Sequence, residues 1–181
     1  PAEAEETYLK AIEAHKRQGA LVSLIGPYNG LGHVLREQQR YEESRAYFRR
    51  ALALAQESDD DVNMGVAYMN LGQSAILQGR LADAKHELAI ALNILEHTSF
   101  WNGLARVYEY MAELNLRLGN CAEAVRCADL RVDLARRHAN APMEEAARQQ
   151  RAAALRAAAT GAGGARHAPG TAARDEERSE P

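Results

Sequence analysis

Hydrophobic positions along the chain recur at spacings of three and four residues, which is the period of an amphipathic helix. The stretch from Tyr41 to Ala55 is typical, with Phe48, Ala51 and Leu52 on one face. No segment alternates between apolar and polar residues as a half-buried strand does. The pattern predicts an all-α chain with helices at residues 2–17, 21–38, 41–57, 61–78, 81–97, 101–118, 121–139 and 142–159.

Residues between these segments favour helix ends. Gly79 and Gly119 each follow the last apolar position of a helix, where a left-handed C-terminal cap favours glycine. Ser58, Asp59 and Asp60 precede the fourth helix and have the short polar side chains of an N-cap. Pro27 lies within the second helix and cannot donate a backbone hydrogen bond. We therefore expect that helix to be kinked or to start late, near Gly26.

The helical pattern repeats every 40 residues. Residues 28–32 (YNGLG) are matched by residues 68–72 (YMNLG) and, more weakly, by residues 108–112 (YEYMA). The same offset relates the second halves of the units, where the matched sets are Ser44, Phe48, Ala51 and Leu52; Ala84, Leu88, Ala91 and Leu92; and Ala124, Ala128, Arg131 and Val132. Two good copies and a poorer third in one register indicate a repeat architecture.

These residues resemble the tetratricopeptide repeat. That family has an aromatic residue followed by Leu-Gly on its first helix, and small, aromatic and small residues on its second. The resemblance implies a right-handed α-solenoid of antiparallel helix pairs, in which the glycine allows two helices to approach closely. The period of 40 exceeds the family's usual length of about 34 residues. It is similar to the longer repeats of kinesin light chains, cell-polarity scaffolds and bacterial multidomain regulators.

The register also predicts how the chain is divided. Residues 1–19 form the second helix of a truncated leading repeat, and residues 20–59, 60–99 and 100–140 form three repeats, the last degenerate. Residues 141–159 form a capping helix, and residues 160–181 form a disordered tail. Because the first helix carries Tyr8, Leu9 and Ile12 without a partner helix, we expect an upstream helix in the native protein or self-association through this helix.

Composition and charge exclude some classes of partner. The formal net charge is -3, from 22 basic and 25 acidic residues, so no excess of positive charge favours nucleic acid or an anionic membrane surface. No apolar run approaches the length of a transmembrane helix, and the acidic start lacks a signal peptide. Two cysteines six positions apart on one helix cannot face each other. These features predict a cytoplasmic protein that binds neither nucleic acid nor membrane.

The sequence offers no catalytic constellation, and we expect neither an enzyme nor a cofactor or metal. His86-Glu87 lacks the second histidine that a metalloprotease helix needs. Cys121 takes a place where the repeat has a large apolar residue, so we expect it to be buried. Phe100-Trp101 precedes a first helix, where packing over the preceding helix end is favoured and an exposed partner anchor is the alternative.

The resemblance implies a partner-binding surface on the inner face of the solenoid, lined by the first helix of each repeat. By register, its residues are Asn29, His33, Arg36 and Glu37; Met69, Asn70, Gln73 and Leu77; and Glu109, Tyr110, Glu113 and Arg117. Amides and charges suit a peptide backbone, and apolar side chains among them suit its anchors. The alternative is an ordinary solvated helix face.

These features together predict a protein- or peptide-binding module. In view of the resemblance to bacterial regulators, we expect it to be the sensor or scaffold part of a larger regulatory protein. A stand-alone adaptor with no attached output domain is the alternative.

Overall fold

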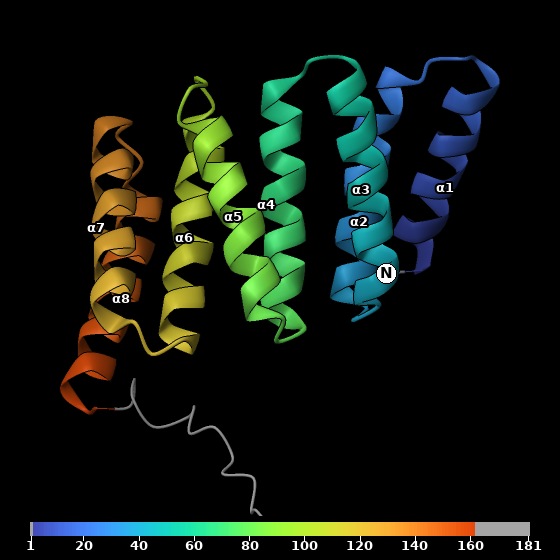
Figure 1. Cartoon of the computed structure of the whole chain (residues 1–181). Coiled ribbons are helices and arrows are strands. Elements are labelled where there is room, and N and C mark those ends of the chain that lie inside the picture. Colours follow the sequence, from blue (N-terminus) through green and yellow to red (C-terminus); the bar gives the residue numbers. More distant parts are fainter. Residues whose placement is uncertain (1, 162–181) are drawn as a thin grey trace, which may run out of the picture.

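The computed structural model describes residues 2–161, and over this range the chain is helical with no strand (Figure 1). Its elements are α1 (Ala2–Arg17), the 3-10 helix η1 (Val22–Leu24), α2 (Ile25–Glu37), α3 (Tyr41–Glu57), α4 (Asp61–Leu77), α5 (Leu81–Leu95), α6 (Trp101–Arg117), α7 (Cys121–Arg137) and α8 (Ala141–Ala159). The all-α prediction is confirmed. The predicted tail lies outside the described residues, except for Thr160 and Gly161.

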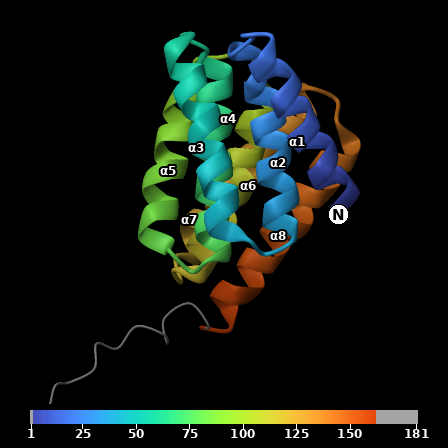
Figure 2. The same cartoon turned by 90° about the vertical axis from the view of Figure 1, so that its right-hand side faces the viewer.

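The helices stack in chain order into a solenoid. Each helix packs on the next, and the first helices of successive repeats also touch, α2 on α4, α4 on α6 and α6 on α8. Over residues 2–161, the backbones of α3 and α5, and those of α5 and α7, do not approach each other as closely. Figure 2 looks along the stack from the α1 end and shows α3 and α5 together on one side. We call the side formed by α2, α4, α6 and α8 the A face, and the side formed by α3, α5 and α7 the B face.

The repeated glycines lie where two helices meet. A Cβ added to Gly32 would lie 2.5 Å from the Phe48 ring, and one added to Gly72 would lie 2.7 Å from Leu88 Cγ. Both partner side chains are completely buried. The missing side chain on one helix thus makes room for the large side chain on the next, which explains why the two positions repeat together.

Helix ends follow the expected chemistry. Gly79 and Gly119 have φ angles of 74° and 79°, in the left-handed region that favours glycine. The second helix starts late, as expected: the α-helical part begins at Ile25, which places Pro27 in the first turn, where its missing N–H leaves no hydrogen bond unmade. Asp60 caps α4, with its Oδ1 accepting a hydrogen bond from Asn63 N at 3.0 Å.

The Asp60 cap predicts a pH-dependent contribution to stability. Hydrogen bonds from the Asn63 backbone and side chain hold the pKa of Asp60 below its usual value. The contribution is therefore complete above about pH 4, the usual pKa of aspartate, and is lost as the pH falls through the folded-state pKa. We expect Asp60→Ala to cost about 1 kcal/mol at pH 7 and less at pH 3. Urea unfolding at both pH values measures this difference.

The cap of α8 supplies the matched control. Asn140 Oδ1 accepts from Met143 N at the same distance, 3.0 Å, but an amide does not titrate. Asn140→Ala should therefore cost a similar amount at both pH values. An Asp60→Ala cost that did not change with pH would contradict the assignment of the cap to the ionised carboxylate.

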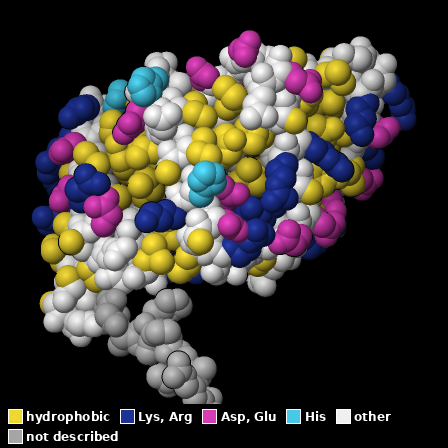
Figure 3. All heavy atoms as spheres, in the orientation of Figure 1, with side chains coloured by type: hydrophobic (Ala, Val, Ile, Leu, Met, Phe, Trp, Pro, Cys, Tyr) yellow, Lys and Arg dark blue, Asp and Glu magenta, His cyan; other side chains and the backbone are white. Residues whose placement is uncertain are grey.

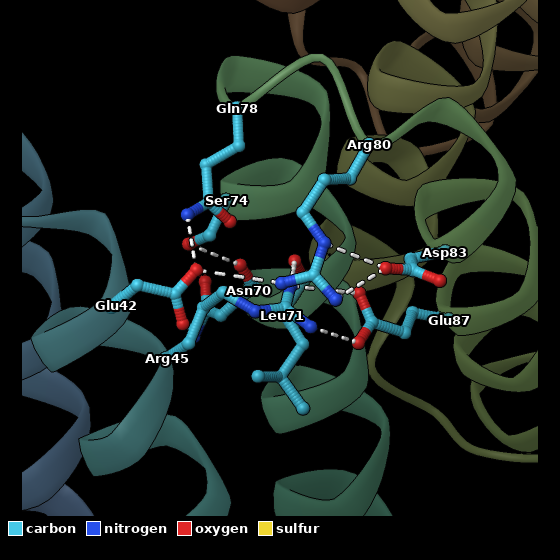
Figure 4. A network of polar contacts seen from close by, with 9 residues as sticks. All are labelled: Glu42, Arg45, Asn70, Leu71, Ser74, Gln78, Arg80, Asp83 and Glu87. Carbon is cyan, nitrogen blue, oxygen red and sulfur yellow. Dashed lines mark hydrogen bonds and ion pairs between the residues drawn. The ribbon is translucent and has the colours of Figure 1, made fainter.

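A buried ion pair fastens the first complete repeat to the second (Figure 4). Arg45 on α3 is only 1% exposed. Its Nη2 lies 2.7 Å from Glu87 Oε1 on α5, and its Nη1 donates to the Leu71 carbonyl on α4 at 2.8 Å. At the exposed end of this network, Glu42 on α3 accepts hydrogen bonds from Gln78 and Arg80. Three helices are thus joined by charged and amide groups.

The weak third repeat contains a second buried arginine. Arg131 stands where the earlier repeats have Ala51 and Ala91. Its Nη2 lies 2.8 Å from Glu109 Oε2, and its Nη1 donates to Gln150 Oε1 at 3.1 Å. Gln150 in turn donates to the Glu109 carbonyl at 2.8 Å. The departure from the repeat pattern therefore builds a polar junction between α6, α7 and α8.

Three other sequence features take defined positions. The Trp101 ring stacks on His138 at the end of α7, with ring centroids 4.1 Å apart, whereas Phe100 is 36% exposed. Cys121 and Cys127 are both buried thiols, and burial raises the pKa of Cys127 to about 11. Within the described residues, no helix has the length and apolar character to cross a bilayer.

The N-terminal helix has large apolar side chains on its buried side and one on its exposed side. Ile12 is buried against the core, whereas Leu9 on the same helix is 42% exposed. Leu21 and Val22, at the adjoining turn, are also exposed. Self-association through this helix stays a prediction, which sedimentation over a range of concentrations tests.

Candidate partner-binding surface

The predicted surface residues lie on α2, α4 and α6, the helices of the A face, but at different depths. Met69, Asn70 and Tyr110 are buried. Asn29, His33, Arg36, Gln73, Glu109 and Glu113 are half-buried, and Glu37, Leu77 and Arg117 are exposed. The buried members lie where α4 packs against its neighbours α2 and α6, and Met69 and Tyr110 belong to the apolar core. Only the half-buried and exposed members are open to a partner.

The fold brings part of the set together as a basic cluster. His33 Nδ1 and Arg36 Nη2 are 2.8 Å apart on α2, and the Arg36 guanidinium lies 5.6 Å from the centre of the Phe48 ring. Across α4, Arg106 Nη1 donates to the Tyr110 hydroxyl at 3.2 Å. Arg36 and Arg106 are close enough for each charge to act on the other. We call His33, Arg36, Arg106 and Tyr110 the A-face cluster.

Burial and positive charge set the ionisation of this cluster. Burial, followed by the charges of Arg36 and Arg106, lowers the pKa of His33 to about 4. Burial also lowers the pKa of Arg36, which nevertheless stays protonated at neutral pH. His33 is therefore neutral at pH 7, and its Nδ1 can accept the hydrogen bond from Arg36. The cluster carries two positive charges from its arginines.

Several polar atoms around the cluster have no hydrogen-bond partner. They are Arg36 Nη1, Asn70 Oδ1 and Gln73 Oε1, all buried. Asn70 is otherwise held only by a long contact, 3.5 Å, from its Nδ2 to Asn29 Oδ1. Within residues 2–161, neither Arg36 nor Arg106 forms an ion pair. Unsatisfied buried groups are unfavourable, so the half-buried residues among these, Arg36 and Gln73, are the part of the A face best suited to receive a ligand.

Other predicted residues are already engaged within the fold. Glu109 is paired with Arg131. Glu113 pairs with Arg117, whose Nη1 also donates to the Ile76 carbonyl at 3.0 Å. Arg117 therefore links α6 to α4. A partner that used these groups would have to displace existing bonds.

Arg106 was not among the surface residues predicted from the sequence. The register started each list at the position of Asn29, and Arg106 precedes the corresponding Glu109 by three residues. The available signal was the spacing of four between Arg106 and Tyr110, which places both on one face of α6.

Two comparisons bear on the family. Residues 23–97 match the family model described as tetratricopeptide repeat. No curated protein is similar enough to the chain to count as a relative.

Solved structures show the same fold. The chain is similar to a putative kinesin light chain from Podosopora anserina with nearly identical TPR-like repeats, at a TM-score of 0.69 and 14% identity, over 88% of this chain and 79% of that one. A single-substitution variant of that protein gives a TM-score of 0.70 with the same identity and coverage. BtubC (BKLC) from P. vanneervenii gives 0.55 at 15% identity, over 86% and 71% of the two chains.

The 40-residue register, the glycine contacts between paired helices and the match over residues 23–97 agree with one another. Residues 23–97 are therefore similar to tetratricopeptide repeats, and the described chain folds as an all-α solenoid.

Proposed function

We propose that the chain binds a segment of a partner protein along its A face, and that the A-face cluster holds an acidic group of that segment. Tetratricopeptide repeats are protein-interaction scaffolds, so a protein partner fits the fold. The observation that supports this surface most directly is the buried Nη1 of Arg36, which has no acceptor. A partner carboxylate would complete its hydrogen bonding and offset the charges of Arg36 and Arg106.

A neighbouring amide extends this surface. Gln73 on α4 is half-buried and has an unpartnered side-chain oxygen, which suits a backbone N–H of an extended segment. Leu77, exposed near the end of the same helix, offers an apolar contact. The proposed ligand is therefore a peptide segment with a carboxylate near one end of its contact with α4 and an apolar side chain near the other.

Peptides selected from a displayed random library test this proposal. We expect selection on the wild-type chain to enrich acidic peptides. Arg36→Gln should weaken a selected peptide at least tenfold, because a charge-assisted pair is lost. Arg50→Gln is the matched control: Arg50 is an exposed arginine on α3, where its guanidinium lies over Tyr47, and the affinity should stay within about twofold. Equal effects of the two changes would contradict the proposed surface.

We also propose a cytoplasmic sensor or scaffold role within a larger regulatory protein. The two buried thiols and the balanced surface charge are compatible with a reducing compartment. The stand-alone adaptor is the alternative. The genomic reading frame distinguishes them, because a regulator would carry an output domain in the same frame, and an adaptor would not.

A further inference from the structure

On the B face, a groove lies between α5 and α7, and α6 forms its floor. A pocket of about 360 Å³ lies there. Its lining residues are Lys85 and Leu88 on α5; Met111, Leu114, Asn115 and Leu118 on α6; Asn120 in the following turn; and Glu123 and Arg126 on α7. Leu88 and Leu114 are buried at the floor, and Leu118 is 40% exposed at the mouth.

The same groove one repeat earlier is filled by the chain itself. Moving the lining residues back by 40 positions leads to the groove between α3 and α5, where Arg45 reaches Leu71 and Glu87 (Figure 4). In the later groove, Lys85 replaces Arg45 and Cys127 replaces Glu87. The buried ion pair therefore has no counterpart, and the space that Arg45 occupies stays open.

The other substitutions make the later groove more apolar. Leu114 replaces Ser74, Leu118 replaces Gln78, and Ala82 replaces the Glu42 that bridges the first groove. Asn115, which replaces Ala75, donates to the Met111 carbonyl at 2.8 Å. That carbonyl corresponds to the one that Arg45 bonds, so it needs no external donor. In Figure 3, charged side chains gather over α3 and α4, a hydrophobic patch lies towards α5, and further charged side chains lie along the α7 edge.

The charged residues at the mouth of the groove favour a negatively charged ligand. Glu123 is neutralised by Arg126, whose Nε and Nη2 donate to the two carboxylate oxygens at 2.9 and 2.6 Å. Lys85 forms no ion pair within the part of the chain that the structure describes, and it is exposed. The groove thus combines an apolar floor with one uncompensated positive charge.

We propose that this groove, which we call the B-face groove, is a second protein-docking site, and that it takes an apolar side chain flanked by a carboxylate from a partner segment. The apolar side chain fills the space over Leu88, Met111 and Leu114, and the carboxylate pairs with Lys85. The site is independent of the A-face cluster, because it lies on α5, α6 and α7 and shares no residue with it.

Methionine-methyl NMR provides a direct readout of this groove. Of the four methionines in the chain, Met111 alone lines the pocket, and Met64, Met69 and Met143 lie elsewhere. The probe is the capped tripeptide Ac-Asp-Phe-Asp-NH2, with Ac-Asn-Phe-Asn-NH2 as the uncharged control. We expect the first peptide to shift the Met111 methyl signal saturably while the other three stay in place, and the second to bind at least tenfold more weakly.

Two variants separate the groove from other sites. Lys85→Glu changes an exposed residue and should weaken the acidic peptide at least tenfold. The triple change Lys85→Arg, Asn115→Ala and Cys127→Glu introduces the residues that form the buried ion pair in the earlier groove. The new pair should fill the pocket and abolish the Met111 shift. If the triple variant fails to fold, Lys85→Glu alone decides. An unmoved Met111 signal, or equal binding of the two peptides, would overturn the proposal.

Discussion

Replacing Glu87 with glutamine should lower the free energy of unfolding by about 3 kcal/mol, because it leaves the buried Arg45 guanidinium without a countercharge. The side chain of Arg45 is 2% exposed and that of Glu87 is 13% exposed, so water cannot substitute for the lost carboxylate. Arg45 Nε already lacks a partner, which makes the guanidinium more dependent on its remaining bonds. Urea unfolding followed by circular dichroism measures the loss.

A surface pair provides the control for this experiment. Glu113 and Arg117 lie 2.7 Å apart, but their side chains are 39% and 42% exposed, so water reaches both. Glu113→Gln should therefore change stability by less than about 1 kcal/mol. The double change Arg45→Met with Glu87→Leu removes both buried charges and should recover most of the loss. A Glu87→Gln effect as small as that of Glu113→Gln would show that the pair does not fasten the repeats.

Gly72→Leu should lower the free energy of unfolding by about 1–3 kcal/mol through overpacking. Even a Cβ at this position would lie 2.7 Å from Leu88 Cγ and 3.4 Å from the Leu88 backbone nitrogen. Leu88 is completely buried and cannot swing into solvent, so α4 and α5 must separate. The melting temperature and the urea midpoint should both fall.

Gly26 is the matched glycine for this change. It lies in the first turn of α2, and a Cβ there would meet nothing within 4 Å. Gly26→Ala should leave stability unchanged or raise it by up to about 1 kcal/mol, since alanine favours helix. If Gly72→Leu were as well tolerated as Gly26→Ala, the close approach of α4 and α5 would be wrong.

The sequence predicts the solenoid well because its signals are local and repeated. Apolar spacing places the helices, glycine marks their ends, and Gly32 and Gly72 recur with the large residues that pack on them. The late start of the second helix also follows from one residue, Pro27, whose ring lacks an N–H. Each of these inferences needs only the chemistry of a few neighbouring positions.

The buried arginines were not predictable in the same way. On a helix, an arginine at the position of Arg45 is equally compatible with a solvated face, and only the meeting of α3, α4 and α5 supplies Glu87 and the Leu71 carbonyl. In the sequence, Arg131 appears only as a departure from the alanine of the earlier repeats, although it forms the junction with α8. In both cases the partner lies on another helix, at a distance that a one-dimensional pattern does not encode.

The sequence predicted which helices carry the candidate surface residues, but not how deeply each residue is buried. Register assigns Met69, Asn70 and Tyr110 to the A face, and the structure places all three on the helices of that face. Their burial depends on how closely α4 approaches α2 and α6, which the 40-residue period does not determine. Arg106 was missed for a related reason: its proximity to Arg36 spans two repeats.

Mapping a bound peptide onto the chain shows directly which face of the solenoid holds the partner. A library-selected peptide is titrated into isotope-labelled protein, and the shifts of the backbone amide signals are measured by NMR. We expect the largest shifts to cluster on the A face, around Asn29, His33, Arg36, Gln73 and Arg106. Shifts confined to α3, α5 and α7, with these five signals unmoved, would contradict it.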